Sequence, residues 1–220
     1  IKLAQENGPI SVKHTDRVLQ WSNVAFDGSV YDIFSSLLNG ATLHLIDKKL
    51  SSDIKALAEE IQDKGITVAF ITTALFNVFA DTEIEGLQSL RKLLFGGERV
   101  SLMHVQKVYD KLGPNKMIHC YGPTETTVYA TYYSINNRPE HNVPIGRPLS
   151  NTSAYVLNPF NRLCGIGVIG ELHLGGDGLA IGYLNDQELT INKFIENPYK
   201  SESLMYKTGD MVRWLSDGNL

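Results

Sequence analysis

Short apolar runs alternate with amphipathic stretches through the first half of the chain, and this alternation restricts the fold more than any other feature. Run 66–71 has the length and the apolar character of a buried strand, and 91–95 is expected to form another strand. Stretch 51–64 has apolar residues at helical spacing, and Gly65 follows it as a typical helix terminator. Strands and helices that alternate at this spacing predict an α/β fold with a mainly parallel sheet covered by helices.

The same pattern places the individual elements. The helix that follows Ser29 has one apolar face, and Gly40 is expected to end it. That face consists of Val30, Ile33, Phe34, Leu37 and Leu38. Strands are expected at 18–26, 41–46, 66–71, 91–95 and 117–121, and further helices at 51–64, around Phe76 and between Ser101 and Gly113.

The pattern changes at about residue 134, where glycine and proline become frequent and helical periodicity fades. Short strands are expected at 153–157, 170–174 and 204–207, with one helix at 187–194. These features predict a smaller, mostly-β subdomain that resembles a distorted barrel. We therefore expect an α/β subdomain over 1–134 and a β-rich subdomain over 135–220.

Three loops that follow predicted strands are candidates for a ligand site. They begin after Phe26, Phe95 and Tyr121. In open parallel sheets, ligands bind in the crevice beyond the carboxyl ends of the strands. Because all three loops are expected at that end, the residues alone place a ligand site there.

The composition excludes several classes of protein. The formal net charge is -4 and Lys and Arg form no block, which argues against nucleic acid or an anionic membrane as the main partner. No apolar run approaches the length of a membrane span, and the first residues do not have the pattern of a signal peptide. Cys120 and Cys164 are far apart, so a reduced, cytoplasmic setting is expected. The histidines are scattered, which argues against a hydrolase or a zinc site.

A cluster of hydroxyl groups and one carboxylate lies where strand 117–121 is expected to leave the core. A Gly-Pro turn at 122–123 is followed directly by Thr124 and Glu125. Hydroxyl groups bind phosphate oxygens, a carboxylate binds Mg²⁺, and the ring of Tyr121 can stack on a base. Gly-Pro turns followed by β-branched polar residues also occur in sheets without a ligand. The residues alone leave both interpretations open.

The unbroken string Tyr-Gly-Pro-Thr-Glu-Thr at 121–126 resembles the nucleotide-binding motif of adenylate-forming enzymes. With Phe-Asp-x-Ser at 26–29 and Tyr-x-Thr-Gly-Asp at 206–210, the chain resembles, over essentially its whole length, the adenylation domains of nonribosomal peptide synthetases. The resemblance implies ATP-dependent and Mg²⁺-dependent activation of an amino acid as an aminoacyl adenylate. It also implies loading onto the phosphopantetheine of a carrier protein, with condensation domains as further partners.

The resemblance implies roles for residues near the nucleotide. Thr124 and Glu125 correspond to catalytic residues, with Glu125 as the Mg²⁺ ligand, and Asp210 corresponds to the residue that accepts both ribose hydroxyls. His119 stands where an amide side chain often meets the adenine, and Ile181 stands where the family usually has Arg. The positions implied to bind the nucleotide are Gly96, Gly97, Glu98, His119, Tyr121, Thr124 and Asp210.

Asp27 has two interpretations. An isolated Asp before a helix favours an N-cap, with Ser29 as a competitor for that position. Within the resemblance, Asp27 pairs with the α-ammonium group of the substrate, because a buried ammonium group needs a fixed anion. The resemblance implies an amino-acid pocket formed by Asp27, Gly28, Tyr31, Phe70, Leu94, Gly96, Cys120, Val128 and Tyr129.

These pocket positions predict the type of side chain that the substrate carries. Once Asp27 holds the ammonium group, no charged residue remains among them, so acidic and basic side chains should be rejected. Gly28 and Gly96 are expected to leave room at two walls, while aromatic and aliphatic residues narrow the others. We expect a branched aliphatic amino acid such as isoleucine.

The chain opens without a start methionine and stops at Leu220 within an expected hairpin, so we expect it to be part of a longer protein. The family's catalytic lysine belongs to a C-terminal lid domain, and its phosphate loop lies upstream of the residues that match this chain. We therefore expect little or no activity from these 220 residues alone. Two alternatives stay open: a segment of an acyl- or aryl-CoA ligase, which has no use for an ammonium-pairing Asp27, and a non-catalytic module that binds nucleotide or amino acid.

Overall fold

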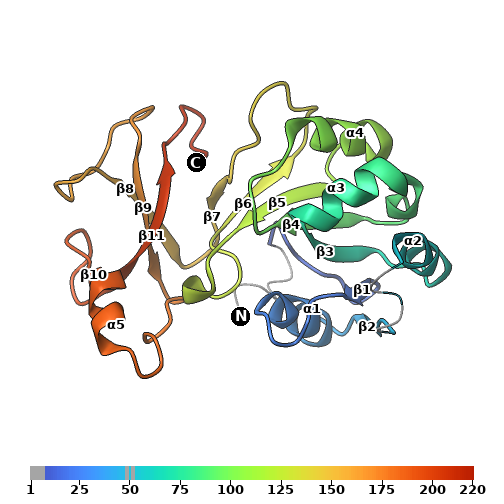
Figure 1. The fold of residues 1–220 in the computed structure, drawn as a ribbon, viewed down its shortest axis with the longest axis horizontal. Coiled ribbons are helices and arrows are strands. Elements are labelled where there is room, and N and C mark those ends of the chain that lie inside the picture. The colour runs from blue at the N-terminus through green and yellow to red at the C-terminus, as the bar shows by residue number, and fades with distance from the viewer. Residues whose placement is uncertain (1–7, 48–49, 51–52) are drawn as a thin grey trace. The chain divides into compact units, whose positions relative to one another are not determined.

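The structure of the protein is a computed structural model that describes residues 8–47, 50 and 53–220. Its helices and strands form two compact units (Figure 1). The first comprises Ile1–Cys120 and Tyr133–Val143, and the second comprises Tyr121–Tyr132 and Pro144–Leu220. The subdomain boundary expected after residue 134 stays a prediction.

The larger of the two sheets has seven strands. They are β1 (Arg17–Gln20), β2 (Thr42–Leu45), β3 (Val68–Thr72), β4 (Lys92–Gly96), β5 (Met117–Tyr121), β6 (Thr131–Ile135) and β7 (Arg147–Pro148). Their order is β2-β1-β3-β4-β5-β6-β7. Neighbouring strands from β2 to β5 pair in parallel, whereas β6 and β7 pair antiparallel. The mainly parallel sheet expected from the alternating pattern is confirmed.

The first strand is shorter than the sequence predicts. The expected strand 18–26 ends at Gln20, and the amide of Phe26 instead donates to the carbonyl of Asn23 at 2.8 Å. The side chain of Asn23 also accepts a hydrogen bond from the amide two residues further on, which is a typical turn made by Asn. This turn leads directly into α1 (Gly28–Leu37).

Three helices bury their apolar faces on one side of this sheet (Figure 1). They are α2 (Ile54–Asp63), α3 (Thr73–Thr82) and α4 (Leu102–Leu112), accompanied by the short 3₁₀ helix η3 (Ile84–Leu87). Asp53 caps α2, because its side chain accepts a hydrogen bond from the amide of Ala56 at 3.0 Å. Residues 51 and 52 of the expected helix lie outside the described residues. The core under these helices includes the stacked rings of Phe76 and Phe95, with centroids 4.2 Å apart.

α1 lies on the other side of the sheet (Figure 1). Its polar side is the one that contacts the protein. Its buried residues are Gly28, Ser29, Tyr31, Asp32, Ser35 and Ser36. The apolar face identified in the sequence is exposed instead, with 51% exposure at Phe34, 58% at Leu37 and 64% at Leu38. The apolar pattern therefore identified the helix but not the side that contacts the sheet.

Asp32 lies at the centre of the buried side of α1, with none of its surface exposed. Its Oδ2 accepts a hydrogen bond from the amide of Ser22 at 3.0 Å, and its carbonyl accepts one from the hydroxyl of Ser36 at 3.0 Å. Burial raises the pKa of this carboxyl to about 7, against the opposing effect of the hydrogen bonds from Ser22. The hydrogen bond from Ser22 joins the helix to the loop that precedes it.

The second unit contains a four-stranded antiparallel sheet in the order β10-β11-β9-β8. The elements are η4 (Thr124–Thr126), β8 (Thr152–Leu157), β9 (Gly170–Gly176), α5 (Gln187–Lys193), β10 (Phe194–Glu196) and β11 (Leu204–Val212). Val156, Leu172 and Leu174 form its core, and Ala130 and Leu220 contact them. The expected smaller, mostly-β part of the chain is confirmed, with β8 and β10 at the two edges of the sheet.

Among the described residues, no helix combines the length and the apolar character needed to cross a lipid bilayer.

Candidate functional site

Four of the predicted pocket residues lie on one face of the larger sheet. Phe70 of β3 is paired in register with Leu94 of β4, and Gly96 of β4 is paired with Cys120 of β5. Successive side chains of a strand point to opposite faces, so positions two apart share a face. The parallel register therefore brings these four positions together, although up to 50 residues of sequence separate them.

Two glycines at this face allow close approach of other groups. A Cβ at Gly28, at the start of α1, would lie 3.2 Å from the ring of Phe70. A Cβ at Gly96 would lie only 2.0 Å from the carbonyl oxygen of Cys120. The room expected beside Gly96 is thus filled by the neighbouring strand, because β5 approaches the backbone of β4 closely at this position.

Tyr31 and Cys120 contribute uncharged groups to the same region. Tyr31 has none of its surface exposed, and its hydroxyl donates to the carbonyl of Ile10 at 3.0 Å. Burial raises the pKa of the Tyr31 hydroxyl well above its usual value. Burial likewise raises the pKa of the Cys120 thiol, which is 1% exposed. Both groups are therefore neutral at physiological pH.

Asp27 occupies the N-cap position of α1, but its side chain makes no capping hydrogen bond. Its Oδ2 atom is buried and has no hydrogen-bond partner among the described residues. Ser29 does not cap the helix either, since its hydroxyl donates to the carbonyl of Phe26 at 2.8 Å. A buried carboxylate oxygen without a donor is costly, and a bound cation would compensate it. The N-cap interpretation of the Asp27 side chain is therefore wrong.

The other predicted nucleotide residues of the first unit occupy two different environments. Gly97 and Glu98 are exposed just after β4, and Gly97 has a φ of 102°, which favours glycine. His119 is 4% exposed and stacks on Phe95, with ring centroids 5.5 Å apart. Because His119 and Cys120 are neighbours on β5, their side chains lie on opposite faces of the sheet.

In the second unit, two predicted nucleotide residues that are 89 positions apart are in direct contact. The hydroxyl of Tyr121 donates to Oδ2 of Asp210 at 2.6 Å. Burial and the nearby carboxylate of Asp210 raise the pKa of Tyr121, so the phenol keeps its proton. The register of β11 shifts between Lys207 and Met211, and such a bulge redirects a side chain at the edge of a site.

The loop that follows Tyr121 folds back on itself. The amide of Ala130 donates to the carbonyl of Tyr121 at 2.8 Å. A Cβ at Gly122 would lie 2.6 Å from the carbonyl oxygen of Val128, so only glycine fits there. Thr127 and Val128 have φ values of 64° and 62°, which are unfavourable for β-branched residues. Such backbone strain is concentrated at ligand-binding loops in proteins.

Residues of this loop differ in their exposure. Val128 and Tyr129, two of the predicted pocket residues, are 4% and 3% exposed. Thr124 is exposed and Glu125 is half-buried, both within η4.

Glu125 has two partners that the sequence did not indicate. The hydroxyls of Tyr183 and Tyr206 both donate to its Oε1, at 2.5 Å and 2.8 Å. No group of three His, Cys, Asp or Glu side chains is arranged to hold a metal ion within the described part of the chain. A Mg²⁺ ion held through Glu125 would take its remaining oxygens from substrate phosphates and water, which is usual for this ion.

Comparison with known proteins gives a match to one family over most of the chain. A family model described as "AMP-binding enzyme" matches residues 2–184. Bacitracin synthase 1 of Bacillus licheniformis is 50% identical over 222 residues, which cover 100% of this chain and 4% of that protein. Surfactin synthase subunit 3 of Bacillus subtilis (strain 168) is 44% identical over 207 residues, which cover 93% of this chain and 16% of that protein. The chain thus spans a small part of the length of these relatives.

Solved structures agree with the sequence relatives. PA1221, described as a nonribosomal peptide synthetase protein containing adenylation and PCP domains, is similar with a TM-score of 0.92 at 30% identity, over 100% of this chain and 45% of that one. The N-terminal subdomain of Klebsiella oxytoca NpsA, in complex with 3-hydroxybenzoyl-AMSN, gives a TM-score of 0.89 at 29% identity, over 99% of this chain and 56% of that one. With the motifs in the positions described above, the chain belongs to the AMP-binding enzyme family and, within it, to the adenylation domains of nonribosomal peptide synthetases.

Proposed function

We propose that this chain provides the amino-acid-binding and nucleotide-binding residues of a domain that converts an amino acid and ATP into an aminoacyl adenylate. The observation that carries the proposal is the buried Oδ2 of Asp27, which has no partner among the described residues. A substrate ammonium group would supply the missing partner. The family membership and the contact between Tyr121 and Asp210 support the nucleotide part of the proposal.

In this proposal some residues of the chain bind the two substrates and others position the reacting groups. Asp27 holds the ammonium group of the amino acid, while Tyr121 and Asp210 hold the nucleoside. The substrate carboxylate is ionised at neutral pH, so it attacks the α-phosphate without a general base, and positioning and charge neutralisation account for catalysis. The hydroxyl of Thr124 binds a phosphate oxygen. Mg²⁺, held through Glu125, would supply the neutralising charge on the phosphates.

The substrate side chain that fits best is apolar and branched, with isoleucine as the first candidate. Phe70, Leu94 and Cys120 lie on the sheet face that Tyr31 and Gly28 approach from α1. None of these residues carries a charge, so a charged substrate side chain would lose its hydration without gaining a partner. Discrimination between neighbouring aliphatic amino acids should amount to about 1–3 kcal/mol per methylene.

The fold by itself does not determine whether the substrate is an amino acid or an aryl acid. NpsA has a similar fold, and its N-terminal subdomain was solved in complex with 3-hydroxybenzoyl-AMSN. Asp27 favours the amino acid here, because an acid without an amine would leave its buried Oδ2 without a partner. A segment of an acyl- or aryl-CoA ligase is therefore the second candidate.

We further propose that the chain works within a longer synthetase. The lysine of a C-terminal lid and an upstream phosphate loop would complete catalysis, so these 220 residues alone should have little or no activity. The product would pass to the phosphopantetheine of a carrier domain and then to a condensation domain, in the cytoplasm. The proposal of a carrier domain is supported by the similarity to PA1221, which contains adenylation and PCP domains.

The test is amino-acid-dependent ATP–pyrophosphate exchange by the complete domain that carries this chain, over a panel of amino and aryl acids. Asp27→Asn should lower kcat/KM for the best amino acid about 100-fold, because an ion pair of about 3 kcal/mol is lost. Asp53→Asn is the matched control, since Asp53 also begins a helix but its side chain caps it. Exchange that is strongest with an aryl acid, or equal loss in both variants, would refute the amino-acid assignment. No exchange with any acid would favour the non-catalytic module.

A further inference from the structure

Two tyrosine hydroxyls converge on one oxygen atom of Glu125. Tyr183 Oη lies 2.5 Å and Tyr206 Oη lies 2.8 Å from Oε1, and the two hydroxyls are 3.2 Å apart. Both of these side-chain hydrogen bonds go to the same carboxylate oxygen, Oε1. The two tyrosines therefore hold the carboxylate by one of its two oxygens.

The two contacts also favour the ionised form of the carboxylate. A hydrogen bond from a hydroxyl group stabilises a charged acceptor more than the neutral one. Hydrogen bonds to an ionised acceptor are short and strong, in agreement with the distances of 2.5 Å and 2.8 Å.

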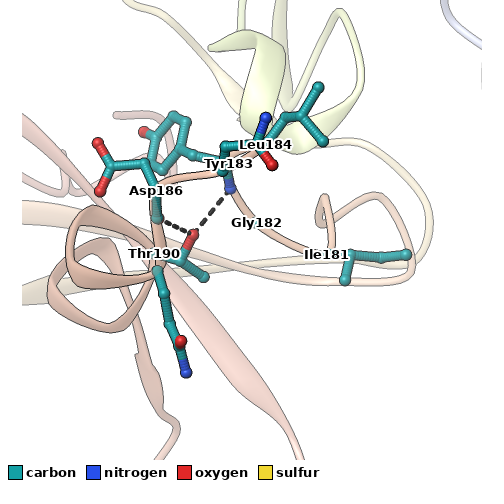
Figure 2. A pocket seen from close by; sticks show the side chains of 8 residues that line it. Ile181, Gly182, Tyr183, Leu184, Asp186 and Thr190 are labelled. Atoms are coloured by element: carbon teal, nitrogen blue, oxygen red, sulfur yellow. Dashed lines mark hydrogen bonds between the residues drawn. The ribbon is translucent and has the colours of Figure 1, made fainter.

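Tyr183 is positioned by the segment that leads into α5. Figure 2 shows the hydroxyl of Thr190 between the amide of Tyr183, which donates to it at 2.8 Å, and the carbonyl of Asp186, to which it donates at 2.8 Å. A Cβ at Gly182 would lie 2.5 Å from the Thr190 side chain, so this close approach requires glycine. The ring of Tyr183 contacts Phe194 edge-on, with centroids 5.8 Å apart.

Tyr206 is positioned by the sheet of the second unit. It lies on β11 opposite Phe194 of β10, and it is 5% exposed. Its ring contacts that of Phe194 at a centroid distance of 5.1 Å. The same phenylalanine therefore supports both tyrosines. The loop of Glu125 is also tied to the segment before Tyr183, since the amide of Ala180 donates to the carbonyl of Glu125 at 2.8 Å.

We propose that Tyr183 and Tyr206 are positioning residues that hold Glu125 by one oxygen and leave the other for the divalent cation that accompanies ATP. The inference rests on the proposed function, because it assigns Glu125 to that cation. Removal of a residue that hydrogen-bonds to a metal ligand typically lowers metal affinity or activity about 10–100-fold. A purely structural role would predict that the tyrosines matter for stability and not for the cation.

The first experiment uses the 220-residue chain and requires no activity. The carboxyl ¹³C resonance of Glu125 is followed against pH in the parent chain, Tyr183→Phe, Tyr206→Phe and Tyr155→Phe, with Glu125→Gln identifying the signal. Tyr155 is the matched control, because its hydroxyl accepts a hydrogen bond from Asn197 in the same unit but does not contact Glu125. The titration midpoint of Glu125 should rise in the first two variants and stay constant in the third. An unchanged midpoint in both would show that the hydroxyls do not hold the carboxylate.

The second experiment measures the Mg²⁺ dependence of pyrophosphate exchange in the complete domain with the same variants. Tyr183→Phe and Tyr206→Phe should each raise the Mg²⁺ concentration for half-maximal exchange about tenfold, while the rate at saturating Mg²⁺ changes less. Tyr155→Phe should leave the Mg²⁺ dependence unchanged. An unchanged Mg²⁺ dependence in both tyrosine variants, with an active parent, would overturn the positioning role. A parent without exchange would refute the proposed function instead, and the titration of Glu125 would still decide whether the tyrosines hold it.

Discussion

At Gly96 the absence of one carbon atom determines how closely two strands approach. The position was predicted as a pocket wall with free space, yet the carbonyl of Cys120 would lie 2.0 Å from an added Cβ. At Asp27 an expected contact is missing instead. Its position at a helix start suggested a cap, yet its buried Oδ2 has no hydrogen-bond partner among the described residues. At both positions the neighbouring atoms, and not the residue type, decide the role.

Gly96→Ala should destabilise the protein by about 1–3 kcal/mol, because the added methyl group meets backbone that cannot move aside without disturbing the sheet. Urea denaturation of the 220-residue chain measures the change. Gly165→Ala is the control, since a Cβ there meets nothing within 4 Å and its backbone is not in the left-handed region. Equal stability of the two variants would show that β4 and β5 are less closely spaced than described.

Helix α1 departs from the usual amphipathic pattern. Its polar side contacts the rest of the first unit, and Phe34, Leu37 and Leu38 on its apolar side are more than half exposed. α3 follows the usual rule, with Phe76 and Phe79 fully buried. Hydrophobic periodicity alone cannot distinguish these two cases, because it reports that a helix has an apolar side and not what covers it.

The two helices should respond differently to the same substitution. In the 220-residue chain, Phe34→Ser should change the free energy of unfolding by less than about 0.5 kcal/mol, as is usual for an exposed position. Phe79→Ser should cost at least about 3 kcal/mol, because it leaves a cavity in the core and a buried hydroxyl. Thermal and urea denaturation of both variants measure these changes. A large loss in the Phe34 variant would mean that its ring is buried in the folded chain.

At the scale of the whole molecule, Asp16 joins segments that are far apart in sequence. Its side chain, which is 3% exposed, accepts hydrogen bonds from Arg91 at 3.0 Å and 2.5 Å and from the hydroxyl of Thr67 at 2.8 Å. These residues immediately precede β1, β4 and β3. Burial raises the pKa of Asp16, but the hydrogen bonds from Arg91, Lys13 and Thr67 outweigh it and the pKa lies below its usual value.

This network predicts how stability depends on pH. Because the folded pKa of Asp16 is lower than the unfolded value of about 3.9, its contribution is present above that value and is lost as the pH falls through the folded pKa. Asp16→Asn should cost about 3 kcal/mol at pH 7, and the difference from the parent chain should shrink as the pH falls below about 4. Urea denaturation of the chain between pH 2 and about 7 measures the difference.

Asp110→Asn is the control for this prediction, since Asp110 pairs with Arg138 on the surface, where both side chains are about half exposed. Such surface pairs contribute little. A difference between the Asp16 variant and the parent chain that does not depend on pH would contradict the ionic role of Asp16.

The sequence by itself determined the fold class, most elements and the family. Strand β5 and the helices α2 to α4 follow from local apolar spacing, and the strings at 121–126 and 206–210 carried the resemblance. These features are local, so a single stretch of chain contains all the information that they need. The prediction of a strand at 18–26 is wrong beyond Gln20, because a turn at Asn23 interrupts the apolar run.

Only the tertiary structure decided which distant residues meet. The contact of Tyr121 with Asp210 spans 89 residues, and the contacts of Glu125 with Tyr183 and Tyr206 span 58 and 81. No periodicity relates such positions, because their separation depends on the path of the chain between them. The exposed side of α1 and the close approach at Gly96 were also decided by the tertiary structure, since both depend on what lies beside the residue in space.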